Sequence, residues 1–147
     1  MRARTHSSTG KLEMDYVVTP SSVRIARVIV SAHLNLWGLG QLADGACLAV
    51  SELLTNVWQH TRPNQLGQRN VHVTLTRTPD GVVLCVHDPD PRLPESVRTA
   101  DDDESGRGLF LVQELAHRFG VSPSPSGGKD VWLSFLNTTG SVSAAAR

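Results

Sequence analysis

The chain has 147 residues, 39% hydrophobic and 19% charged, which fits one ordinary globular domain. Lysine plus arginine equals aspartate plus glutamate at 14 each, so the chain has no net charge. Direct nucleic-acid binding, which a net positive charge would favour, is therefore not expected. No apolar run approaches the roughly 20 residues that a membrane-spanning helix needs. The N-terminal stretch lacks the apolar core of a signal peptide, so we expect a cytoplasmic protein that does not contact membranes.

The first half of the chain predicts one strand and two helices. Residues 1–10 are polar and are expected to be disordered, whereas residues 11–18 alternate apolar and polar side chains, as a half-buried strand does. A helix is predicted to begin at Pro20 and to end before Gly38, where its apolar spacing stops. A second helix is predicted over residues 43–60, with one broad apolar face.

The next segment predicts an antiparallel hairpin followed by a long polar loop. Residues 71–75 alternate in hydrophobicity, and a Pro-Asp-Gly turn at 79–81 leads into the apolar run 82–86. Residues 88–108 contain almost nothing apolar and cannot form a core element. A loop of this length inside a domain is uncommon without a function, so we interpret it as a lid.

The last elements complete an α+β domain. A short amphipathic helix is predicted over 109–119, opened by the glycines of 106–108, and a final strand over 130–136. Residues 138–147 are expected to be a disordered tail, which leaves 11–137 as a single domain. The order of elements predicts a two-layer sandwich, with helices packed on one face of a mixed, mainly antiparallel sheet.

Three polar residues recur every fourth position on the second helix: Glu52, Asn56 and His60. Residues at this spacing lie on one face, so they can reach into one cavity. A carboxylate can deprotonate a hydroxyl group, and an amide oxygen can bind Mg²⁺ together with substrate phosphates. The same stripe also fits the wet side of a surface helix, and His60 alone fits an ordinary helix end.

Two other features point to an anionic ligand. The glycines of Gly106-Arg107-Gly108 would let a phosphate approach the backbone at a helix start, although a simple hinge has the same composition. Asp88 ends the apolar strand VVLCVHD, where its carboxylate can accept a hydrogen bond from a ligand amino group. An aspartate before Pro89 is equally common in a turn.

Taken in order, these stretches resemble the nucleotide-binding domain of the GHKL superfamily, which includes gyrase, heat-shock chaperones, histidine kinases and mismatch-repair ATPases. The resemblance covers residues 11–136 and implies the Bergerat-type sandwich. More narrowly, it points to the bacterial anti-sigma-factor serine kinases and their stand-alone relatives. The stretches that carry it are SELLTNVWQHT, VHDPDPRLP, DDDESGRGLFLVQELAHRFGV and GGKDVWLSF.

The resemblance implies a role for each matching residue, with ATP and Mg²⁺ as cofactors. Glu52 would be the general base toward a serine hydroxyl, Asn56 the Mg²⁺ ligand, and Asp88 the acceptor of the adenine amino group. The lid segment over the triphosphate would consist of Gly106, Arg107, Gly108 and Leu109. Phosphoryl transfer needs mainly positioning and charge neutralisation, so this set of residues is sufficient.

Two departures from the family pattern predict weaker nucleotide binding. The family's Asp-x-Gly-x-Gly motif is Asp88-Pro89-Asp90-Pro91-Arg92 here, without either glycine. A threonine that relatives carry in the last strand is Asp130, which the resemblance places in the adenine pocket.

Three functions follow from the resemblance. The first is an ATP-dependent protein serine/threonine kinase that phosphorylates an anti-sigma-factor antagonist and sequesters a sigma factor. The second is a non-catalytic docking module that has weakened or lost nucleotide binding, and the third is a simple ATP hydrolase. Relatives form homodimers, and the sequence leaves the oligomeric state open.

Overall fold

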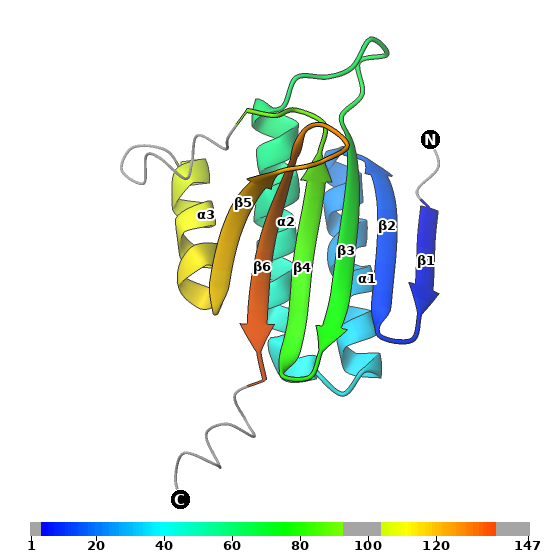
Figure 1. The fold of residues 1–147 in the computed structure, drawn as a ribbon, viewed down its shortest axis with the longest axis vertical. Coiled ribbons are helices and arrows are strands. Elements are labelled where there is room, and N and C mark those ends of the chain that lie inside the picture. Colours follow the sequence, from blue (N-terminus) through cyan, green and yellow to red (C-terminus); the bar gives the residue numbers. More distant parts are fainter. Residues whose placement is uncertain (1–3, 93–103, 138–147) are drawn as a thin grey trace, which may run out of the picture.

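The computed structural model describes residues 4–92 and 104–137, with the backbone alone for 104–109. Three helices lie on one face of a six-stranded sheet (Figure 1). The strands are β1 (Arg4–Ser8), β2 (Lys11–Val17), β3 (Asn70–Thr78), β4 (Gly81–Asp88), β5 (Arg118–Pro123) and β6 (Lys129–Leu136). The helices are α1 (Pro20–Leu36), α2 (Ala43–His60) and α3 (Glu104–Leu115), with a 3₁₀ turn at Gly40–Leu42.

The sheet is built from sequence-adjacent hairpins. Its strand order is β1-β2-β3-β4-β6-β5, and all pairings between the described strands are antiparallel. The α+β sandwich is therefore confirmed, with an antiparallel sheet in place of the expected mixed one. Hairpin β3–β4 meets hairpin β5–β6 in a register that places Asp88 directly opposite Lys129.

Local sequence signals explain where the two long helices begin and end. At the start of α1, the Thr19 hydroxyl accepts a hydrogen bond from the Ser22 backbone N–H, and the Ser22 hydroxyl accepts one from the Thr19 N–H. This reciprocal pair is a capping box, and Pro20 occupies the first helical position, where no N–H is needed. Helix α2 ends at His60 because the chain turns extended at Thr61, shortly before Pro63.

The core lies between the sheet and the helices and follows the alternation read from the strands. Inward side chains of the central strands are buried because every second residue points to the helical layer. The core residues from the strands include Leu12, Met14, Tyr16, Val71, Val73, Leu75, Val82, Leu84, Val86, Val131, Leu133 and Phe135. The helices contribute Ala26, Val30, Leu34, Ala46, Ala49, Val50, Leu53, Leu54, Val57 and Val112.

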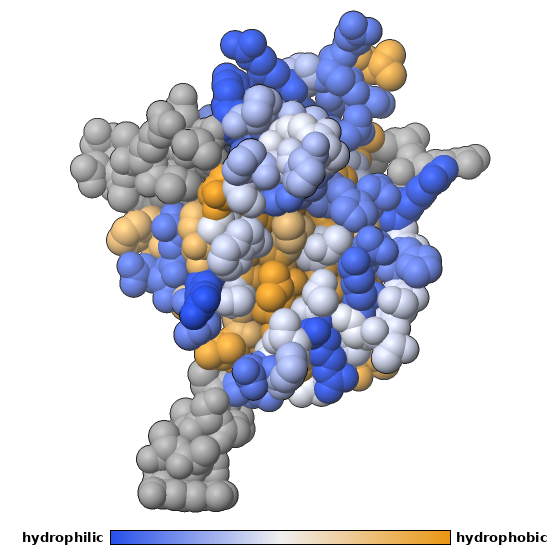
Figure 2. Space-filling view, viewed as in Figure 1, coloured by the Kyte–Doolittle hydropathy of each residue, from blue (hydrophilic) through white to orange (hydrophobic). Residues whose placement is uncertain are grey.

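The other face of the sheet carries no helix in the described structure, and Figure 2 shows it. Its surface is largely polar, with hydrophobic colour in the middle of the sheet (Figure 2). Outward residues there include half-buried Cys85 and Trp132. The Trp132 ring lies against Gly120 of β5, where a β-carbon would be 2.3 Å from the ring.

Several expectations at the edges of the fold are corrected. The polar stretch expected to be disordered contains β1, which pairs with β2 through its backbone while all its side chains are exposed. The helix expected at 109–119 is instead α3, at Glu104–Leu115. Phe119 belongs to strand β5, a segment in which the sequence predicts a helix end and a turn.

Some expectations fall outside the described residues. These are the central part of the expected lid, 93–103, the N-terminal residues 1–3 and the tail 138–147. Within the described part of the chain, no helix has the length and apolar character that crossing a membrane requires.

Candidate functional site

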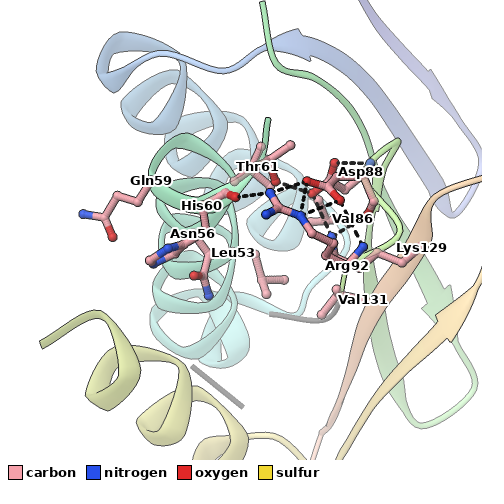
Figure 3. Close-up of a pocket in the computed structure, with 12 residues that line it drawn as sticks. Leu53, Asn56, Gln59, His60, Thr61, Val86, Asp88, Arg92, Lys129 and Val131 are labelled. Atoms are coloured by element: carbon pink, nitrogen blue, oxygen red, sulfur yellow. Dashed lines mark hydrogen bonds and ion pairs between the residues drawn. The ribbon is translucent and has the colours of Figure 1, made fainter. Parts of the chain in front are cut away.

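A cavity of about 250 Å³ opens between the C-terminal half of α2 and the ends of β4 and β6 (Figure 3). Its apolar walls come from the core, and its polar groups come from the ends of the three elements. It is lined by Leu53, Asn56, Val57, Gln59, His60, Thr61, Val86, Asp88, Asp90, Arg92, Lys129 and Val131. Since ligand pockets usually span about 300–1,000 Å³, this space suits part of a nucleotide, such as the base, better than all of it.

Of the three polar residues spaced four apart on α2, two line this cavity and one does not. Asn56 is buried and lines the cavity together with His60, one turn further on (Figure 3). Glu52 lies one turn before Asn56 and is not among the cavity-lining residues. Burial raises the pKa of the Glu52 carboxyl above its ordinary value, so its ionisation moves toward neutral pH.

Asp88 lines the cavity and is only 2% exposed. Its Oδ2 atom accepts a hydrogen bond of 2.6 Å from the Thr61 hydroxyl and one of 3.1 Å from the Lys129 ammonium. Its Oδ1 atom accepts a third, of 2.9 Å, from the backbone N–H of Asp90. The carboxylate therefore joins the end of α2 to the loop after β4 and to the start of β6.

Lys129 lines the cavity and is not among the site residues that the sequence predicts. It is 6% exposed, and its ammonium donates to the Asp88 carboxylate and, at 2.7 Å, to the Asp90 carbonyl oxygen. The alternation of β6 could have identified it. Every second residue of the strand points to the core, as Val131 and Leu133 do, and Lys129 falls on the same side. A buried lysine requires a partner, and the strand opposite ends in Asp88.

Asp130 points to the opposite face of the sheet from Lys129, so the structure does not bring it to the cavity. Its carboxylate lies on the open face of the sheet, 2.8 Å from Nδ1 of His87. The expectation that Asp130 belongs to the adenine pocket is therefore wrong, because neighbouring residues of a strand point to opposite faces.

The two glycines missing from the family motif are replaced by an ion pair at the mouth of the cavity. Arg92 donates to both carboxylate oxygens of Asp90, and its Nη2 donates to the His60 carbonyl oxygen at 2.9 Å. The Arg92 guanidinium holds the pKa of the Asp90 carboxyl well below its ordinary value. These contacts tie the loop after β4 to the end of α2.

The lid residues have a different backbone from the one expected. Gly106, Arg107, Gly108 and Leu109 lie inside the first turns of α3 rather than in a loop before it. Helix α3 packs beside α2, on the side of the molecule that carries the cavity (Figure 3). The contacts of these four side chains lie outside the described structure, so their role over a triphosphate stays a prediction.

No group of three or more His, Cys, Asp or Glu side chains in the described ranges is arranged to hold a metal ion. The buried Asn56 carries an amide oxygen, which is a ligand type that suits Mg²⁺ in a site where waters and phosphates supply the other ligands. The Asp88 carboxylate already accepts three hydrogen bonds from the protein, so about one acceptor position is left toward a ligand.

The comparison with protein-family models agrees with this geometry. Residues 16–135 match the histidine kinase-like ATPase domain, so the chain belongs to that family. The match spans α1, α2 and the cavity-forming strands β4 and β6. Domains of this family bind ATP, usually with Mg²⁺, and the membership supports an ATP-binding regulatory function. A search of the curated proteins found no match.

Proposed function

We propose that the chain binds ATP with Mg²⁺ in the α2–β4–β6 cavity and transfers the γ-phosphoryl group to a serine of a protein substrate. The observation that carries this proposal is the presence of Asn56 and Asp88 in one cavity, from two elements that are distant in sequence. Both residues are buried, and both match positions that bind nucleotide and metal in the resembling family.

In this proposal, each residue has a role that its surroundings support. Asp88, with the apolar walls of Leu53, Val86 and Val131, forms the base end of the cavity. Asn56 faces the phosphate end, where Mg²⁺ bound with the nucleotide neutralises charge on the phosphates. Glu52 accepts the proton of the serine hydroxyl, and burial, which raises the pKa of its carboxyl above the ordinary value, makes it a stronger base.

The partners we propose are an anti-sigma-factor antagonist as the phosphorylated protein and a sigma factor as the sequestered one. The motifs shared with the anti-sigma-factor kinases suggest both classes. A protein partner is also supported by the surface of α3, where Phe110, Leu111 and Leu115 are exposed beside the cavity-bearing helix α2. A homodimer is part of the same proposal.

The first test is calorimetric titration of the purified chain with ATP, with and without Mg²⁺. We expect Mg²⁺ to strengthen ATP binding in the wild type and to lose this effect in Asn56→Ala. Asn35→Ala is the matched control, because Asn35 is exposed near the end of α1 and is not among the cavity-lining residues. Equal Mg²⁺ dependence in all three proteins would show that Asn56 does not serve the metal.

Kinase activity requires a separate assay with radiolabelled ATP and purified candidate antagonists from the same genome. We expect label on a serine of one antagonist and none when Glu52 is replaced by glutamine. ATP hydrolysis without any labelled protein would favour the simple hydrolase.

A second function, docking without catalysis, is favoured by one specific observation. The polar groups of the cavity are already paired with one another: Asp88 with Lys129 and Thr61, and Asp90 with Arg92. A site whose groups satisfy themselves gains less from a ligand. Absence of ATP binding at millimolar concentration, together with sigma-factor binding by the folded chain, would establish this alternative.

A further inference from the structure

A buried ion pair between Lys129 and Asp88 lies in the wall of the cavity. The two residues face each other at the end of the β4–β6 ladder, both less than 10% exposed. Lys129 has three N–H donors, of which two reach the Asp88 carboxylate and the Asp90 carbonyl oxygen. The ammonium is therefore fixed beside the group to which the resemblance assigns the adenine amino group.

The hydrogen-bonding capacity of Asp88 is nearly used up by the protein itself. A carboxylate has about four acceptor positions. Three are filled by the Thr61 hydroxyl, the Lys129 ammonium and the Asp90 backbone N–H. An incoming amino group must take the one that is left or displace one of these donors.

We propose that Lys129 is a built-in competitor for Asp88, so that the cavity binds purine nucleoside triphosphates with little dependence on the 6-amino group of adenine. This inference rests on the proposed nucleotide binding and specifies which nucleotides the site accepts. Lys129 is then a specificity-determining residue that weakens recognition of the base.

The relative strength of the two donors supports this assignment. The Lys129 ammonium is ionised and lies 3.1 Å from the Asp88 carboxylate, so it adds an attraction between opposite charges to its hydrogen bond, whereas the 6-amino group of adenine is neutral and adds none. Moving the ammonium away from Asp88 would leave a buried charge without its counter-ion, which is strongly unfavourable. The amino group therefore gains little at Asp88 in the wild-type protein.

The wild-type protein provides the decisive comparison. Purine riboside triphosphate differs from ATP only in lacking the 6-amino group. We expect the two nucleotides, titrated with Mg²⁺ by calorimetry, to have dissociation constants within about threefold of each other. Where a carboxylate does accept a bond from the ligand, losing that bond weakens binding by about tenfold to a hundredfold. ATP preferred by tenfold or more would overturn the inference and leave nucleotide binding intact.

Replacement of Lys129 tests the same idea in the other direction. In Lys129→Met the side chain keeps its length but loses its charge, so one acceptor position of Asp88 is freed for the base whether the carboxyl is ionised or becomes protonated without its counter-ion. We expect ATP to bind more tightly than in the wild type and to be preferred over purine riboside triphosphate by at least about tenfold. Lys11→Met is the matched control, because Lys11 is half-exposed beside Glu13 on the open face. It should leave both affinities unchanged.

The outcomes separate the inference from the proposed function. Weaker ATP binding by folded Lys129→Met would show that Lys129 binds the nucleotide rather than competing with it. If neither nucleotide binds the wild type or the folded variant, both the inference and the proposed function are wrong. Circular dichroism and thermal unfolding establish that the variant is folded, and the wild-type comparison decides the matter if it is not.

Discussion

Gly128 lies so close to the end of β4 that a β-carbon on it would be 2.1 Å from the carbonyl oxygen of Asp88. Its φ angle of +76° is also in the left-handed region that favours glycine. This close approach lets the β5–β6 turn bring Lys129 to the Asp88 carboxylate. The residue before Lys129 thus fixes the geometry of the buried ion pair.

We expect Gly128→Ala to lower the free energy of unfolding by roughly 3 kcal/mol, because the new β-carbon displaces backbone and the buried ion pair. Gly67→Ala is the control: its φ is +75°, but nothing lies within 4 Å of the added carbon. That variant should lose only the left-handed strain, about 1 kcal/mol. Urea unfolding measures both, and equal losses would contradict the importance of close approach.

Replacement of Glu52 tests its role as the base. Glu52→Gln should reduce phosphoryl transfer by about 10²-fold to 10⁴-fold and leave ATP affinity unchanged. Because the base must be ionised, the wild-type rate should rise with pH through the pKa of Glu52, which burial raises above its ordinary value. Transfer assays over a pH series that starts near the ordinary glutamate pKa of about 4 report this profile, with Glu13→Gln on the open face as control. Full activity in Glu52→Gln would remove the residue from the mechanism.

The Asp90–Arg92 pair predicts an acid-sensitive contribution to stability. The pKa of Asp90 is lowered in the folded chain, chiefly by its hydrogen bond from Arg92. Its stabilising effect is thus fully present above the unfolded pKa of about 4 and is lost progressively as the pH falls from there toward the lower folded pKa. Asp90→Asn should lower stability at pH 7 by about 1 kcal/mol, a modest value because Arg92 is half-exposed.

Urea unfolding of wild type and Asp90→Asn at pH 7 and pH 3 tests this sign. The difference between the two proteins should shrink at the lower pH. A difference that stays constant would mean that the ionised form of Asp90 contributes nothing, and Asp15→Asn, an exposed site, serves as control.

Cys85 is predicted to be a slow thiol. Burial, assisted by the nearby Asp130 carboxylate, raises its pKa to about 11. At pH 8 the thiolate fraction is then about a thousandth, so alkylation by iodoacetamide should be about 10²-fold slower than for a free thiol. Peptide mass spectrometry follows the reaction, with the urea-unfolded chain as reference. Asp130→Asn should accelerate it, and a fast wild-type reaction would contradict the raised pKa.

Much of the fold was predictable because its core elements carry strong periodic signals. Helix α2 was predicted at its observed bounds, since its apolar face is broad and proline follows soon after it. Strand β1 was missed because RTHSS has no apolar residue: only the backbone ladder to β2 makes it a strand. Strand β5 contains glycine and proline, which locally indicate a turn, and the ladder with β6 overrides them.

The candidate site was predictable only in part. Asn56 and Asp88 were expected together, and the structure places both in the cavity. The family motif, matched along the chain, points to Asp130 rather than Lys129, because such a match does not distinguish the two faces of a strand. The Arg92 contact with the His60 carbonyl oxygen depends on tertiary geometry, which no local pattern contains.

The position of the cavity between two hairpins also has a consequence for folding. Asp88 belongs to β3–β4 and Lys129 to β5–β6, and 41 positions separate them in the chain. Each hairpin closes a short loop of chain. The pairing of β4 with β6 closes a longer one and is therefore expected to form late. The cavity does not exist until β4 and β6 are paired. Detachment of the C-terminal hairpin as one cooperative unit would therefore abolish ligand binding while most of the sheet stays intact.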